Sequence, residues 1–272
     1  MSRGDAVLGK GAVLLSFDVE EFDLPREHGV EISVDEGVKV SGVGLKRVLD
    51  VLKAEGVRAT FFTTGNFAER APDLVRRIVA EGHELACHGV DHFAPAATDL
   101  ARSKEIIEKV GGVKVAGYRQ PRMQKIDYKE MARCGYKYDS SVNPAFIPGR
   151  YNHLDTPRRP FCRDGVLEIP TSVATFARVP LFWLALHNFP ERVYLRLVRM
   201  SLKKTGYFAT YFHPWEFADI CGRKEVPFYI KKNSGCKLVG RLRRLVRKLK
   251  RDGYEFGTYA EFAKRAEFAE KK

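Results

Sequence analysis

The sequence predicts an α/β protein in which parallel strands form one distorted barrel of the (β/α)7 type. Short β-like runs alternate with longer stretches of helical period about seven times, which is typical of a parallel sheet covered by helices. No Ser- or Gly-rich linker interrupts the alternation, so we expect a single domain over residues 1–272. No G-x-G-x-x-G or Walker sequence follows a predicted strand, which leaves an open doubly wound sheet as the runner-up.

Eight short apolar or aromatic runs predict the strands. In chain order they cover residues 13–17, 59–62, 84–87, 115–118, 136–138, 167–169, 207–212 and 254–257. The helices between them are predicted from leucines and valines that share one helical face, most clearly in 45–52, 74–79 and 238–249. Residues 154–164 and 220–235 lack a clear period, so we expect long loops there.

The composition and charge narrow the class of protein. With 44% hydrophobic and 30% charged residues, the chain is expected to fold, and collagen, coiled coil and wholesale disorder are excluded. The net charge of +13 is regional, because residues 192–251 hold 17 Lys/Arg against three acidic residues, a net of +14. Such a field indicates an anionic partner or a solvated basic face. No nucleic-acid recognition motif accompanies the charge, so we expect no nucleic-acid partner.

Residues 180–204 combine an apolar aromatic cluster with cations, among them Arg192, Arg196 and Lys203. This mixture suits peripheral docking to an anionic membrane. The alternative is a barrel helix with a basic outer face.

The cysteines and the apolar runs indicate the compartment. The five cysteines are odd in number and contain no C-x-x-C pair, which indicates neither a disulfide framework nor a cysteine zinc site. The apolar run at residues 12–17 is short, and neither a signal peptide nor a transmembrane helix is visible. We therefore expect a cytoplasmic location.

Candidate functional residues follow the predicted strands, where a parallel barrel carries its active site. The first strand ends in Asp18-Val19-Glu20. Because side chains alternate along an extended chain, Asp18 and Glu20 point the same way and offer two oxygen donors. Solvated loop charges are the alternative reading.

Three further strands also end in chemically capable residues. His88 and His92 follow the third strand at a spacing that suits one divalent ion, although structural histidines share that spacing. Arg119 ends another strand and could pair with a carboxylate, lowering its pKa and fixing its orientation, or lie at the surface. The late strand runs into His213. All these residues fall at the same end of successive strands, which favours a hydrolytic metal centre.

These motifs resemble those of the polysaccharide deacetylase family, also called the NodB-homology domain or carbohydrate esterase family 4. The resemblance runs from about residue 14 to residue 262. It implies that Asp18 is the catalytic base, that His88 and His92 bind the metal, and that Arg119 orients the base. It also implies that His213 is the general acid.

The resemblance assigns two further elements of the site. A backbone amide near Arg122 is implied to help hold the oxyanion. Asp139 occupies the place of the fourth motif and is implied to orient the acid, and Asp139 or another carboxylate would raise the pKa of His213.

The first motif departs from the family pattern. Many members have a second aspartate directly after the first, as a metal ligand, where this chain has Val19. Glu20 is the candidate third ligand and Asp18 the alternative. The spacing resembles that of a branch that deformylates lipid-linked aminoarabinose, whereas residues 168–170 and 212–216 resemble a branch associated with exopolysaccharide biosynthesis.

The resemblance thus implies a metal-dependent deacetylase, with Zn²⁺ or a similar divalent ion. We expect it to remove an N-acyl group, in the first place acetyl, from an amino sugar in a polysaccharide or lipid-linked glycan. A deformylase of a lipid-linked amino sugar and a catalytically silent carbohydrate-binding relative are the alternatives.

Overall fold

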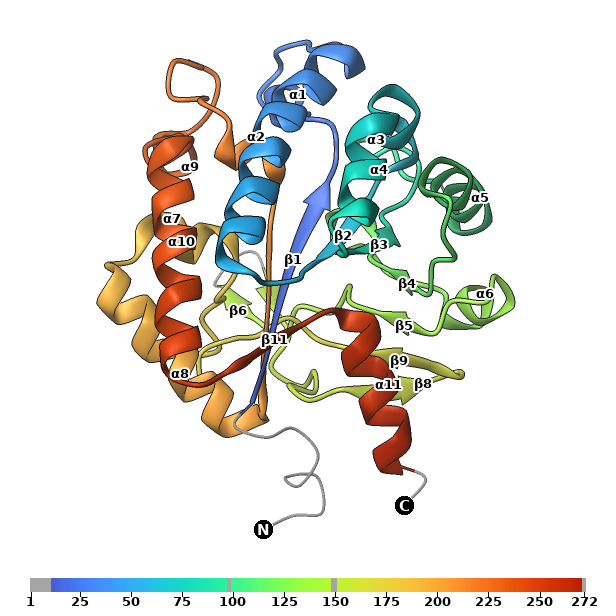
Figure 1. Ribbon diagram of the computed structural model, residues 1–272, viewed down its shortest axis with the longest axis vertical. Coiled ribbons are helices and arrows are strands. Elements are labelled where there is room, and N and C mark those ends of the chain that lie inside the picture. Colours follow the sequence, from blue (N-terminus) through green and yellow to red (C-terminus); the bar gives the residue numbers. More distant parts are fainter. Residues whose placement is uncertain (1–10, 97–98, 148–150, 271–272) are drawn as a thin grey trace.

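A curled, mainly parallel sheet forms the centre of the protein, with helices packed around it (Figure 1). The structure is a computed structural model and describes residues 11–96, 99–147 and 151–270. The hydrogen-bonded order is β10 (Tyr207–Phe212), β1 (Ala12–Val19), β2 (Thr60–Thr63), β3 (Glu84–Cys87), β4 (Gly117–Tyr118), β5 (Tyr138–Asp139), β9 (Val166–Glu168) and β8 (Phe161–Arg163). β11 (Glu255–Gly257) also pairs with β1. Only the β8–β9 pair of this sheet is antiparallel among the described residues, so the predicted parallel barrel-like fold is confirmed as a half-barrel.

The helices follow the strands as the alternation predicts. They are α1 (Leu24–Glu27), α2 (Val34–Glu55), α3 (Gly65–Arg70), α4 (Pro72–Ala80), α5 (Asp99–Gly111), α6 (Tyr128–Arg133), α7 (Trp183–Asn188), α8 (Glu191–Thr205), α9 (Phe228–Lys231), α10 (Cys236–Arg251) and α11 (Tyr259–Glu270). Two 3₁₀ turns, η1 (Pro121–Met123) and η2 (Pro214–Phe217), follow β4 and β10. β6 (Phe146–Ile147) pairs antiparallel with β7 (Tyr151–Asn152). In the described part of the chain, no helix has the length and apolar character needed to cross a membrane.

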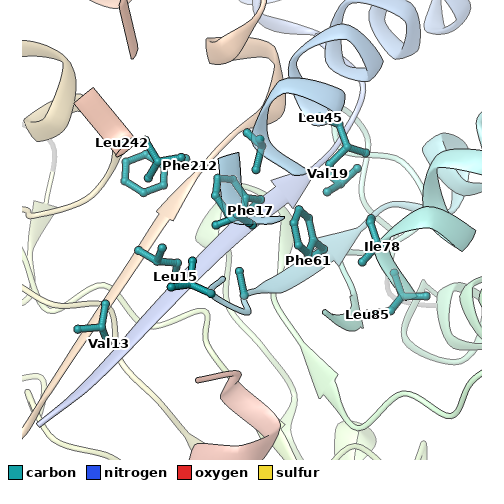
Figure 2. Packing of buried hydrophobic residues seen from close by; sticks show 14 of the residues in the cluster. Val13, Leu15, Phe17, Val19, Leu45, Phe61, Ile78, Leu85, Phe212 and Leu242 are labelled. Atoms are coloured by element: carbon teal, nitrogen blue, oxygen red, sulfur yellow. The ribbon is translucent and has the colours of Figure 1, made fainter. Parts of the chain in front are cut away.

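β1 separates the core from the barrel interior. Its alternate residues Val13, Leu15, Phe17 and Val19 pack among the helices, as Figure 2 shows. The residues between them face the barrel interior. The amino-terminal end of that interior is filled by aromatic rings such as Tyr207, Tyr259 and Phe262. The main pocket lies instead at the carboxyl ends of the strands.

The weakest predictions concern the shortest elements. The expected loop 154–164 contains β8, and the expected loop 220–235 contains α9. These elements have three and four residues, too few for a hydrophobic period to be recognised.

Most of the apolar half of the expected membrane-docking face lies below the surface. Leu181, Phe182 and Leu186 are buried, whereas Trp183 and Leu184 of the same stretch are half-buried. The basic half remains on the surface, since Arg192, Arg196 and the Lys203–Lys204 pair of α8 are exposed.

Close contact between α2 and η2 fixes the backbone beside the pocket. A Cβ atom on Gly44 would lie 1.7 Å from the carbonyl oxygen of Pro214, so only glycine allows this approach. We expect Gly44→Ala to lower the free energy of unfolding by about 2–3 kcal/mol, because backbone must move to admit the methyl group. Denaturant unfolding measures this loss.

A glycine in α10 provides the matched control. A Cβ on Gly240 would meet only the flexible end of Arg244, at 3.1 Å. Gly240→Ala should raise the free energy of unfolding by about 0.5–1 kcal/mol, through helix propensity. Equal effects of the two substitutions would show that the α2–η2 contact is not tight.

Candidate metal centre and hydrolytic site

The structure brings together six of the seven predicted site residues. Five of them line one pocket at the carboxyl ends of the strands: Asp18, Glu20, His88, His92 and His213. Arg119 lies fully buried against Asp18. Asp139 is also buried but is not among the pocket-lining residues.

Glu20, His88 and His92 converge on one point. The Oε2 atom of Glu20 lies 3.4 Å from Nε2 of His88 and 3.1 Å from Nε2 of His92. One potential ligand atom from each of the three residues falls within 4.8 Å of the others. The carboxylate and the two imidazoles form a donor set that suits a divalent ion of the zinc type.

The other ring nitrogens of both histidines are already bonded. Nδ1 of His88 donates to the carbonyl oxygen of Arg119 at 2.8 Å, and Nδ1 of His92 bonds to Asp23 at 2.8 Å. Burial disfavours a charged Asp23, but the hydrogen bond and charge of His92 and the charge of Arg122 hold the pKa of Asp23 below its ordinary value. These outer partners hold both Nδ1 atoms, so Nε2 of each histidine faces Glu20 and is the atom left to bind a metal.

The donor set also fits a cation by its electrostatics. Glu20 Oε2 is buried and has no hydrogen-bond partner among the described residues. Burial opposes a charged His92, yet the carboxylates of Glu20 and Asp23 outweigh it and raise the pKa of His92 to about 9. The pocket therefore favours positive charge at the point where the three side chains meet, and a bound divalent ion would supply it.

Asp18 is held by Arg119 beside this cluster. Arg119 Nη1 donates to Asp18 Oδ1 at 2.5 Å and to Ser16 Oγ at 2.9 Å. Its Nε and Nη2 atoms donate to the carbonyl oxygen and hydroxyl of Ser140, and its guanidinium lies 4.0 Å from the ring centroid of Phe62. Burial opposes ionisation of Asp18, but the guanidinium outweighs it and holds the pKa of Asp18 below its ordinary value. Asp18 is thus an oriented, ionised carboxylate.

His213 faces Asp18 and Glu20 from the end of β10. Its Nδ1 atom bonds to Glu216 Oε1 at 2.8 Å, and its Nε2 atom lies 3.9 Å from Glu20 Oε1. The Trp215 ring stacks on the imidazole, with 4.9 Å between centroids. Burial lowers the pKa of His213, but the carboxylates of Glu20 and Glu216 outweigh it and raise that pKa above its ordinary value.

Asp139, expected to orient His213, contacts other groups in this structure. Asp139 accepts hydrogen bonds from the backbone amide and hydroxyl of Ser141, at 3.1 Å and 2.8 Å. No hydrogen bond or ion pair joins Asp139 to His213 among the described residues, and the printed hydrogen bonds of His213 go to Glu216. Glu216 makes that contact instead, and Ser140, next to Asp139, contributes by holding Arg119.

Other contributors were not recognised from the sequence. The contact of Asp23 with His92 could not be predicted, because it depends on the path of the chain after β1. Glu216 could have been recognised, since it lies three residues after His213 and caps the turn η2. Arg122 and Met123 line the pocket with left-handed backbones, at φ 56° and 51°.

A half-barrel that holds a Glu/His/His cluster beside a carboxylate and a third imidazole belongs to the class of sites suited to metal-dependent hydrolysis. The family model "Polysaccharide deacetylase" matches residues 24–138. The chitooligosaccharide deacetylase of Rhizobium leguminosarum bv. trifolii is 33% identical over 152 residues, which cover 56% of this chain and 68% of that protein. The chain belongs to the polysaccharide deacetylase family.

Further similarities agree with this membership. The peptidoglycan deacetylase of Helicobacter pylori is 31% identical over 127 residues, and the match covers 42% of this chain and 43% of that protein. The chain thus spans less than half the length of that relative. A putative polysaccharide deacetylase from Mycobacterium smegmatis has the same fold, with a TM-score of 0.66 and 23% identity over 93% of this chain and 88% of that one.

Proposed function

We propose that this protein is a metal-dependent hydrolase that removes an N-acyl group, in the first place acetyl, from an amino sugar of a polysaccharide or lipid-linked glycan. The observation that carries the proposal is the convergence of Glu20, His88 and His92 in one pocket. Asp18, whose pKa is lowered, and His213, whose pKa is raised, line the same pocket. The names of the two relatives, a chitooligosaccharide and a peptidoglycan deacetylase, support the substrate class.

In this proposal, Glu20 Oε2 and the Nε2 atoms of His88 and His92 hold the metal, which we propose to be zinc. Asp18 is already paired with Arg119, which favours Glu20 over Asp18 as the third ligand. When bound, the metal polarises the acyl carbonyl and lowers the pKa of water.

The side chains then divide the proton transfers. Asp18, kept ionised and oriented by Arg119, accepts the proton of the attacking water. A backbone amide near Arg122 donates to the oxyanion. His213, whose raised pKa favours the protonated form, gives a proton from Nε2 to the leaving amine. Water and the N-acyl sugar thus yield a carboxylic acid and a free amino sugar.

Acyl release from a panel of N-acylated sugars tests this function. The zinc-loaded protein should release acetate from N-acetylated glucosamine oligomers, and a chelator should abolish release until zinc is restored. Formate release from N-formyl sugars with no acetate release would instead support the deformylase alternative. Sugar binding without either product would support the silent relative.

The exposed cations of α8 support a proposed peripheral contact with anionic membrane. Arg192, Arg196, Lys203 and Lys204 have no carboxylate within 4.0 Å among the described residues. We expect the protein to sediment with vesicles containing anionic lipid at low salt, and to be released at about 0.5 M salt, where screening is strong. Binding that does not depend on anionic lipid would contradict this contact.

The cytoplasmic location stays a prediction.

A further inference from the structure

A buried chain of hydrogen bonds extends from His213 away from the pocket. His213 Nδ1 bonds to Glu216 Oε1, and Glu216 Oε2 bonds to Nε2 of His187, each at 2.8 Å. His187 lies on α7, and Glu216 on η2. The side chains of Glu216 and His187 are both fully buried. Neither resemblance nor motif spacing assigns a role to His187.

The partners of Glu216 require an ionised carboxylate. Oε1 accepts from both the backbone amide and the Nδ1–H of His213, and Oε2 accepts from His187. Burial opposes this charge, but the bonds from His187 and His213 outweigh it and keep the pKa of Glu216 below its ordinary value. An unpaired buried carboxylate would otherwise take up a proton or turn away.

The surroundings of His187 also indicate which of its ring nitrogens carries the hydrogen. Its Nδ1 atom is buried and has no hydrogen-bond partner among the described residues. An orphaned buried N–H is rarer than an orphaned acceptor, so Nδ1 carries the lone pair and Nε2 carries the hydrogen. Nε2–H of His187 therefore donates to Oε2 of Glu216. The α7 backbone is held in turn by Asn233, whose Nδ2 atom donates to the carbonyl oxygen of His187 at 2.6 Å.

We propose that His187 is a positioning residue for proton delivery by His213. By holding Glu216 Oε2, it keeps Oε1 against the Nδ1–H of His213, so that Nε2 of that imidazole faces the pocket. The proposal rests on the proposed function, in which His213 protonates the leaving amine. It adds a residue that touches neither substrate nor metal and sets the tautomer from α7.

Two substrates distinguish a positioning role of His187 from a general loss of active-site structure. Amide hydrolysis needs a proton on the leaving amine, whereas the phenolate of 4-nitrophenyl acetate leaves without one. In zinc-loaded protein, His187→Leu should lower the ratio of kcat on an N-acetylated glucosamine oligomer to kcat on this ester by about 10–100-fold, as for other outer partners. KM should change little. His187→Gln can still donate from its amide, and should restore most of the ratio.

His83 provides the matched control. It is another largely buried histidine, which accepts from the amide of Ala59 and lies beside the Phe61 ring. His83→Leu should cost stability and leave the ratio unchanged. An equal loss on both substrates for His187→Leu, or the same split for His83→Leu, would overturn the proposal.

An NMR measurement keeps this test separate from that of the proposed function. In ¹⁵N-histidine-labelled protein, at a pH above the pKa of His213, the neutral imidazole of His213 should show a single Nδ1–H tautomer, and His187→Leu should convert it to a mixture. If the wild-type protein releases no acyl group from any amino sugar, the proposed function fails, and an unchanged His213 spectrum in His187→Leu would separately overturn the positioning role.

Discussion

Asp18→Asn should leave metal binding intact and lower kcat on an N-acetylated amino sugar by about 10²–10⁴-fold, the usual contribution of a general base. The amide side chain keeps the shape of the carboxylate but cannot take a proton from water. Arg119 retains its bonds to Ser16 and Ser140, so the pocket should keep its form. Steady-state kinetics and zinc analysis of the same preparation measure both quantities.

Glu84 offers a matched control for this substitution. It is a half-buried carboxylate at the start of β3, at the opposite end of the barrel, and accepts from the hydroxyls of Thr60 and Tyr138. Glu84→Gln should change kcat less than about twofold, because general base catalysis depends on a group within reach of the water. Turnover by Asp18→Asn close to wild type would remove Asp18 from the base role.

Glu20→Gln should remove most of the metal affinity, and with it the activity. The amide cannot supply the negative charge that Glu20 Oε2 brings to the two imidazoles. Loss of a ligand should exceed the 10–100-fold effect of an outer partner, so we expect the Kd for zinc to rise more than about 100-fold. Zinc should raise the melting temperature of the wild type and of Asp18→Asn, but much less that of Glu20→Gln.

Glu27 serves as the control for charge alone. It also lines the pocket, but its carboxylate pairs with Arg122 at the rim and is 42% exposed. Glu27→Gln should therefore retain the zinc affinity within a few-fold, because exposed charges are screened. Equal losses for Glu20→Gln and Glu27→Gln would show that overall charge, rather than coordination, sets the affinity.

The parts that the sequence predicted are those set by local pattern. β3 and β10 have the predicted bounds, and β1 extends the predicted run, because a buried parallel strand is a continuous apolar run. The alternation of side chains along β1 placed Asp18 and Glu20 on one side, as the structure has them. The carboxyl ends of parallel strands lie at the same edge of the sheet, as predicted. His88, His92 and His213 therefore line the same pocket.

The parts that could not be predicted depend on tertiary packing. Contact between His187 and Glu216 requires α7 to lie against η2, and no spacing in the sequence encodes that approach. Leu181 and Leu186 are buried in the main hydrophobic core and Phe182 stacks on Tyr211, although the sequence alone predicted a surface cluster. The partner of His213 could not be predicted either, because the order of motifs along the chain does not determine which side chains meet. Glu216 contacts His213, whereas Asp139 contacts Ser141.

Anomalous diffraction at the zinc edge, from crystals of the zinc-loaded protein, would locate the metal among the candidate ligands. We expect one strong peak in the pocket, about 2.0–2.2 Å from Glu20 Oε2 and from Nε2 of both His88 and His92, with Asp18 still bonded to Arg119. A peak ligated by Asp18 in place of Glu20, or one away from the two histidines, would contradict this expectation.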